Sequence, residues 1–312
     1  MISCTEFIPA YSEFFLFLDE NYGKAEVERF WAYLFAPTGD GIPLINFVKK
    51  EGIRGCFSYW AGTLNEEAAD FTMYLNEKAG WFMLDMHHCP SKGRLLEMAE
   101  KEEFRPYQNY CLHCDGYRAA VEKIGLRYLY NFTGIDYAAC SILIYDPEVF
   151  DGRVLVDAET VVMHRKAADN PYFHKDFHSS MNMGIHYLGE HFGKQTVEAY
   201  LKQYTRKLYS GVIADYKKRG LCAITEKIRR TYENEQASNV LSIKETASDI
   251  DVVISKCPAV THLHQTGRQV SPWYRYTTQT VMQTLAEACK IKFYMDSYDE
   301  QTGAAHYRFI KE

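Results

Sequence analysis

The chain lacks the features that mark several large classes of protein. No apolar run approaches the length of a transmembrane helix, and the first twenty residues have no basic start and carry acidic residues early, unlike a secretory signal. A net charge of -6 argues against nucleic acid as the main partner, because phosphate binding needs a basic surface. We therefore expect a soluble, cytoplasmic protein with neither a membrane nor a nucleic-acid partner.

Familiar cofactor and catalytic signatures are missing as well. The sequence has no Gly-x-Gly-x-x-Gly or Gly-x4-Gly-Lys-Ser/Thr phosphate loop, no Gly-x-Ser-x-Gly elbow and no His-Glu-x-x-His zinc motif. Nucleotide binding therefore has no support. Cysteine is present, but nine is an odd number in a chain of 312 residues, which favours reduced thiols over a disulfide framework.

The chain does contain a long internal repeat. Residues 49–90 (KKEGIRG…MHHCP) align without a gap on residues 217–258 (KKRGLCA…ISKCP). A match of this length at a fixed offset predicts two tandem copies of one domain. The matched pairs include Gly52/Gly220, Glu77/Glu245 and Cys89-Pro90/Cys257-Pro258.

Hydrophobic periodicity predicts the same order of elements in both copies. Helical patterns come first, and short runs rich in β-formers follow as two hairpins with a helix between them. This order predicts an α+β fold in which each copy has N-terminal helices and then an antiparallel sheet of two hairpins with a crossing helix. In the first copy the expected strands are 69–75, 81–86, 126–132 and 139–145.

We expect domain boundaries that follow this repeat. Residues 1–147 form the first domain, 148–177 a connector with a strand-like run near Val154–Val156, and 178–312 the second domain. The two copies are expected to pack as an internal pseudo-dimer, and a further homo-oligomer is possible.

Reactive side chains concentrate in the first copy. His88 and Cys89 close a β-rich run before Pro90, Cys114 and Asp115 come at the expected start of a helix, and Cys140 opens the last strand. A helix start offers free N–H groups and a positive dipole, which would lower the pKa of a thiol. The second copy keeps Cys257-Pro258 but loses the other members, so we expect one working site, in the first copy.

These motifs resemble a known family. The segments His88-Cys89-Pro90, Cys111-Leu-His-Cys114-Asp115 and Gly134-Ile-Asp-Tyr-Ala-Ala-Cys140 are similar to those of the L-2-amino-thiazoline-4-carboxylic acid hydrolases. The resemblance covers the first copy most clearly. It implies hydrolytic opening of a cyclic isothiourea to an N-carbamoyl-cysteine product.

The chemistry of the same residues suggests a reaction independently of this family resemblance. Cys89 or Cys114 can act as a nucleophile, and Asp115 can hold an amidinium group or act as a general base. His88 or His113 can carry the proton. We therefore predict a small-molecule hydrolase acting on a C–N bond of a cyclic isothiourea or amidine-like substrate.

A second interpretation uses these atoms as metal ligands. The residues Cys89, Cys111, His113, Cys114 and Cys140 include enough soft donors for a four-coordinate zinc ion, so the cofactor is either zinc or none. The corresponding alternative function is a non-catalytic, sensor-like protein that binds a small ligand or a metal.

Other histidines are expected to have ordinary roles. His262 and His264 are predicted to share one face of a polar loop. His174 and His178 fall in or next to the connector, where we expect them to be solvated. His87 and His88 should point to opposite faces of a strand, so only one of them can reach the site.

Overall fold

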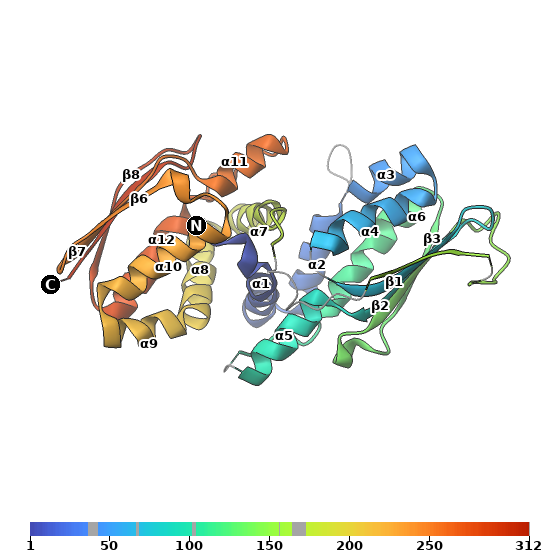
Figure 1. The fold of residues 1–312 in the computed structure, drawn as a ribbon, viewed down its shortest axis with the longest axis horizontal. Helices are drawn as coiled ribbons and strands as arrows, with labels where there is room; N and C mark the ends of the chain where they lie inside the picture. Colours follow the sequence, from blue (N-terminus) through green and yellow to red (C-terminus); the bar gives the residue numbers. More distant parts are fainter. Residues whose placement is uncertain (37–42, 67–68, 102–103, 156, 164–172, 312) are drawn as a thin grey trace. The chain divides into compact units, whose positions relative to one another are not determined.

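The computed structural model describes residues 1–312 except 37–42, 67–68, 102–103, 156, 164–172 and 312 (Figure 1). Helices combine with two antiparallel sheets, so the predicted α+β class is confirmed. Contacts divide the chain into a central unit, Phe15–Tyr172, and a terminal unit, Met1–Phe14 with Phe173–Glu312. We expected residues 1–14 to belong with the first copy, whereas here they pack with the second half of the chain.

The central unit begins with helices and continues into a sheet. Helix α1 starts in the terminal unit and ends in the central one. The elements are α1 (Phe7–Tyr22), α2 (Lys24–Phe35), α3 (Pro43–Glu51), α4 (Arg54–Glu66), β1 (Asp70–Asn76), β2 (Trp81–His88), α5 (Pro90–Lys101), η2 (Tyr110–Gly116), α6 (Tyr117–Lys123), β3 (Arg127–Asn131), η3 (Ile135–Tyr137), β4 (Cys140–Tyr145) and β5 (Glu159–Met163).

The central sheet has the strand order β3-β4-β2-β1-β5, with every printed pair antiparallel. The β1–β2 hairpin turns at Gly80, whose φ of +65° favours glycine, and the Asn76 side chain accepts from the Ala79 N–H at 3.0 Å. The expected connector thus supplies the edge strand β5. The run we expected near Val154 lies before it, and Val156 itself is outside the described residues.

One face of this sheet carries the core. Side chains alternate between buried and less buried along β1, β2 and β4, and the helices lie on the buried face (Figure 1). The core includes Trp60, Phe71, Phe82, Leu84, Val121, Tyr128 and Ile144. Stacking of Trp60 on Phe82, with ring centroids 5.5 Å apart, fixes α4 against β2.

The terminal unit also places helices before a sheet of two hairpins. Its elements are η1 (Cys4–Glu6), α7 (Phe177–Phe192), α8 (Lys194–Leu208), α9 (Ser210–Arg219), α10 (Leu221–Asn234), η4 (Ser238–Val240), β6 (Leu241–Glu245), β7 (Asp249–Ile254), α11 (Pro258–Gln265), α12 (Tyr276–Cys289), β8 (Lys292–Tyr298) and β9 (Ala305–Ile310).

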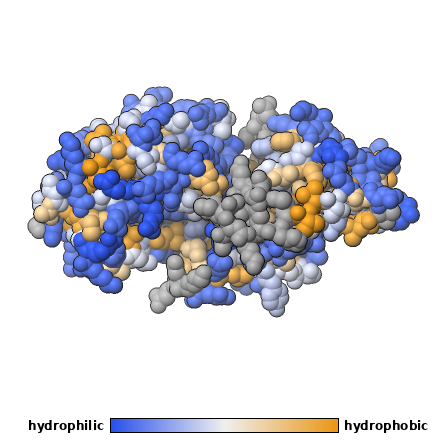
Figure 2. Space-filling model, viewed as in Figure 1, coloured by the Kyte–Doolittle hydropathy of each residue, from blue (hydrophilic) through white to orange (hydrophobic). Residues whose placement is uncertain are grey.

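The strand order of the terminal sheet is β6-β7-β9-β8, which matches β1-β2-β4-β3 in the central sheet. Both sheets are therefore two hairpins joined through their second and fourth strands. None of the described helices is long and apolar enough to cross a membrane. The face of the molecule in Figure 2 is mostly hydrophilic, with small apolar patches.

Candidate active site

Cys89 lies at the turn from β2 into α5. Its N–H donates to the carbonyl of Ala138 at 2.7 Å, which ties the end of β2 to the loop before β4. Pro90 then starts α5, and the N–H of Lys92 donates to Cys89 Sγ at 3.5 Å. The partly exposed thiol is thus held at the N-terminus of a helix, where the helix dipole favours a thiolate.

The two adjacent histidines have different surroundings. His87 hydrogen-bonds to Asp70 and to Thr72, both at 2.9 Å. The exposed His88 lies against α5, because a Cβ at Gly93 would come within 2.2 Å of its Nε2. Only His88 therefore lies beside the helix that Cys89 precedes.

Cys111, His113, Cys114 and Asp115 lie on the 3₁₀ helix η2. We expected Cys114 and Asp115 to begin an α-helix, and this was wrong: the chain passes through η2 directly into α6, so no free helix start exists at Cys114. The N–H of Tyr117 is already bonded to the carbonyls of Cys114 and Asp115. The positive end of a helix dipole therefore lies next to Cys89 and not next to Cys114.

Two tyrosines of β3 hold η2 in place. The hydroxyl of Tyr128 donates to the carbonyl of Cys114 at 2.9 Å, and that of Tyr130 donates to the carbonyl of Cys111 at 3.4 Å. On the other side, a Cβ at Gly116 would lie 2.1 Å from the ring of Phe35, so η2 also packs tightly on α2. The backbone around both cysteines is therefore fixed by side chains from other elements.

His113 and Cys114 form a thiol–imidazole pair. His113 Nδ1 donates to the carbonyl of Tyr110, which can only accept, and Nε2 lies 3.6 Å from Cys114 Sγ. In the neutral ring this leaves the lone pair of Nε2 facing the thiol. The imidazole is also packed against Phe15 and Tyr110, with ring centroids at 5.7 and 4.8 Å. A thiol, an imidazole and a carbonyl that orients the imidazole thus lie together.

Asp115 already has a cationic partner. Arg118 donates from Nη2 to Oδ1 at 2.7 Å and from Nε to Oδ2 at 3.3 Å, and its Nη1 donates to the carbonyl of Tyr128 at 2.6 Å. The hydrogen bond to Asp115 raises the pKa of Arg118. The two-point contact that we expected for a substrate amidinium is occupied by this guanidinium.

Cys111 and Cys140 are more sheltered members of the same neighbourhood. Burial raises the pKa of Cys140 to about 12, with a further contribution from Cys114, while Tyr130 lowers it. Burial also raises the pKa of Cys111, with smaller contributions from Cys114 and Cys89. Burial therefore makes a thiolate harder to form at Cys111 and Cys140 than at an ordinary thiol.

Lys92 is a member of this site that the sequence did not indicate. It is only 9% exposed, and its positive charge lowers the pKa of Cys111. A lysine in the first turn of a helix normally reaches solvent, so the position of Lys92 two residues after Cys-Pro did not predict its burial. A buried ammonium group beside thiols can hold a substrate carboxylate.

The five predicted zinc ligands do not form a ligand set in this conformation. Over the part of the chain that the structure describes, one group of three donors has its ligand atoms within 4.8 Å of one another, and none of the five belongs to it. All nine cysteines are free. The geometry of this corner thus favours thiol chemistry over a preformed zinc site.

Two predictions about histidines outside the site were wrong. His262 and His264 lie on α11, where residues two apart point in different directions, so they do not share a face. His264 bonds instead to the carbonyl of Gln301 at 2.8 Å. His178, which we expected to be solvated, is 1% exposed on α7.

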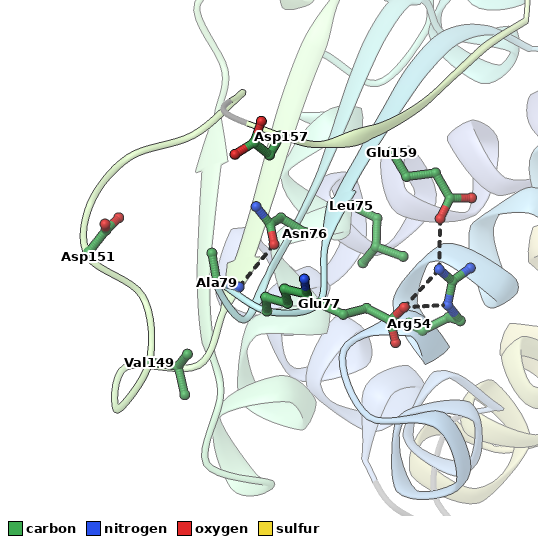
Figure 3. Close-up of a pocket in the computed structure, with 10 residues that line it drawn as sticks. Arg54, Leu75, Asn76, Glu77, Ala79, Val149, Asp151, Asp157 and Glu159 are labelled. Carbon is green, nitrogen blue, oxygen red and sulfur yellow. Dashed lines mark hydrogen bonds and ion pairs between the residues drawn. The ribbon is translucent and has the colours of Figure 1, made fainter.

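A hollow of about 650 Å³ opens elsewhere in the central unit, beside the β1–β2 turn (Figure 3). Arg54 in its lining donates to Glu77 at 2.9 Å and to Glu159 at 2.7 Å, and these bonds raise the pKa of Arg54. Because no thiol or histidine lines it, we do not assign the reaction to this hollow.

Comparisons with protein-family models, with curated proteins and with solved structures give no match. The residues of the site are therefore the basis for proposing a function.

Proposed function

We propose that the central unit is a small-molecule hydrolase that uses Cys114 as its nucleophile and His113 as its base. The observation that carries the proposal is the 3.6 Å contact between Cys114 Sγ and His113 Nε2, with Nδ1 anchored on the carbonyl of Tyr110. Both side chains are partly exposed, so a small substrate can reach them. We assign the nucleophile to Cys114 on the strength of this pairing with His113.

The proposed substrate is a cyclic isothiourea or amidine-like compound, and the resemblance of the cysteine motifs to L-2-amino-thiazoline-4-carboxylic acid hydrolases supports it. The thiol adds to the amidine carbon while its proton passes to His113 Nε2. For an aminothiazoline, the proton then goes to the ring sulfur as the bond between this sulfur and the amidine carbon breaks. Water attacks the same carbon and expels Cys114, with a second proton transfer through His113. Lys92 would bind the substrate carboxylate, and Asp115 would bind the amidinium only after releasing Arg118.

A second function is favoured by the sheltered thiols. Cys111 and Cys140 surround Tyr130 and stay protonated, which suits binding of a small ligand without turnover. In either case we propose a cytoplasmic protein that acts on small molecules, because all nine cysteines are free thiols.

The test uses 2-amino-thiazoline-4-carboxylate, whose opening releases a thiol, and 2-chloroacetamidine, an amidine that alkylates thiols. Wild type should hydrolyse the first and be labelled first at Cys114 by the second. Cys114→Ala should lose about a thousandfold in turnover and His113→Gln about a hundredfold, because one removes the nucleophile and the other the base. Cys222→Ala, which removes a partly exposed thiol of the terminal unit, is the control.

Full turnover by Cys114→Ala would overturn the assignment of the nucleophile. Saturable binding of the thiazoline without thiol release, together with equal labelling of Cys114 in wild type and His113→Gln, would favour the non-catalytic function. Preferential labelling of Cys89 would move the nucleophile to the N-terminus of α5.

A further inference from the structure

The terminal unit contains a buried group of metal-ligand residues far from the cysteine motifs in sequence. Cys4 lies on η1, His178 on α7, and Glu235 directly after α10. Their side chains are 0%, 1% and 4% exposed, and one ligand atom of each lies within 4.8 Å of the other two. Three separate segments of the chain thus place a thiol, an imidazole and a carboxylate around one point.

Two hydrogen bonds already hold the three residues together. Glu235 Oε2 hydrogen-bonds to His178 Nε2 at 3.0 Å, and Glu235 Oε1 accepts from the backbone N–H of Cys4 at 2.6 Å. The His178 Nε2 atom and a carboxylate oxygen of Glu235 therefore already face each other within this buried group.

The chemistry of the three side chains also suits a cation. The group combines a carboxylate, an imidazole and a thiol, all buried. A divalent ion would replace the thiol proton and balance the charges of the thiolate and the carboxylate.

We propose that Cys4, His178 and Glu235 bind a thiophilic divalent metal ion of the zinc class. Thiolate, imidazole and carboxylate together suit zinc or cobalt, whereas magnesium and calcium prefer oxygen ligands alone. Tetrahedral ligands about 2.1 Å from zinc lie roughly 3.4 Å apart, so the 3.0 Å spacing between His178 and Glu235 needs only a small expansion. A fourth position remains for water or another side chain.

The bound metal would stabilise the terminal unit. It would join η1 to α7 and to the end of α10, which are otherwise linked here by hydrogen bonds. The free energy of metal binding would add to the free energy of unfolding of this unit. The site lies in a different unit from the proposed hydrolase residues, so either proposal can fail without the other.

The test titrates cobalt into chelator-treated protein and follows the thiolate-to-cobalt charge-transfer absorption. Wild type should bind about one ion per chain, and zinc should raise its melting temperature by several degrees. Cys4→Ala should lose the absorption band. Cys56→Ala is the matched control, because Cys56 is also 0% exposed but lies in the core of the central unit.

Further variants keep the test decisive if Cys4→Ala does not fold. Glu235→Gln preserves volume and should weaken cobalt binding at least about tenfold. Cys114→Ala should retain the band. The proposal is overturned if wild type binds no cobalt or zinc, or if the band survives in folded Cys4→Ala, or if it disappears in Cys114→Ala.

Discussion

The two units contain the same turn, but the cysteine of this turn is more exposed in the central unit than in the terminal unit. Cys89 and Cys257 both follow a strand and precede a helix that starts with proline. The N–H of Cys89 donates to the carbonyl of Ala138, between β3 and β4, at 2.7 Å, and that of Cys257 donates to the carbonyl of Thr302, between β8 and β9, at 2.9 Å. Yet Cys89 is partly exposed, whereas Cys257 is 5% exposed.

The difference comes from the residues around the turn. In the terminal unit, a Cβ at Gly303 would lie 2.4 Å from the Cβ of Cys257 and 2.9 Å from a methyl group of Val260, and Met1 Sδ lies 3.4 Å from Cys257 Sγ. In the central unit the third position of the helix is Lys92 where the terminal unit has Val260. The turn is therefore structural in both units, and its surroundings decide whether the thiol can react.

The largest expected effect is a difference in alkylation between the two cysteines. Cys257 can react only after local opening, and an opening free energy of about 4 kcal/mol would slow it about a thousandfold relative to an exposed thiol. Burial also raises the pKa of Cys257. Iodoacetamide labelling at pH 8, quantified peptide by peptide, measures both rates in the same sample.

Two controls accompany this measurement. Cys222, partly exposed in the terminal unit, should react quickly, and denaturant should bring Cys89 and Cys257 to similar rates. Equal native rates for Cys89 and Cys257 would mean that the terminal turn is open in solution, and the contrast between the units would disappear.

A smaller effect, on the free energy of unfolding, is expected from adding a methyl group at Gly303, next to Cys257. Gly303 has a φ of +66° and lies close to Cys257, whereas Gly267 has a φ of +69° and nothing within 4 Å of an added Cβ. Gly303→Ala should cost about 3 kcal/mol of the free energy of unfolding and Gly267→Ala about 1 kcal/mol, because only the first adds a clash to the backbone strain. Urea unfolding of both variants gives the comparison. Similar losses would show that the loop yields easily.

The sequence predicted this architecture well because its signals are local. Alternation along β1, β2 and β4 and the glycine-terminated helices required no knowledge of distant residues. Strand β5 was displaced from the expected run, since an edge strand is fixed by its partner: Phe71–Leu75 of β1 pair with Glu159–Met163. The repeat remains a prediction from the sequence, and the common strand order agrees with it.

The site was predicted less completely, because local contacts set its side-chain pairs and long-range packing sets the burial of other residues. The pairing of His113 with Cys114 depends on the carbonyl of Tyr110, and that of Asp115 depends on Arg118, three residues along the same helical segment. The spacing of Asp115 and Arg118 could have been predicted as an ion pair on one helix face. The burial of Lys92 and of His178 could not have been predicted, because each depends on packing by elements distant in sequence.

The smallest expected effect concerns Cys140, the first residue of β4, whose place at the start of β9 is taken by Ala305. Burial raises the pKa of Cys140 to about 12, above the value of about 8.5 for an unfolded thiol. A thiol whose pKa is raised by folding stabilises the fold fully below its unfolded pKa, and this contribution is lost as the pH rises toward the folded value. Wild type should therefore lose about 2 kcal/mol more than Cys140→Ala between pH 8 and pH 10. Urea unfolding at each pH measures this difference in the free energy of unfolding. If the free energy depended on pH in the same way in both proteins, Cys140 would titrate as an exposed thiol. The exposed part of the central turn would then extend to β4.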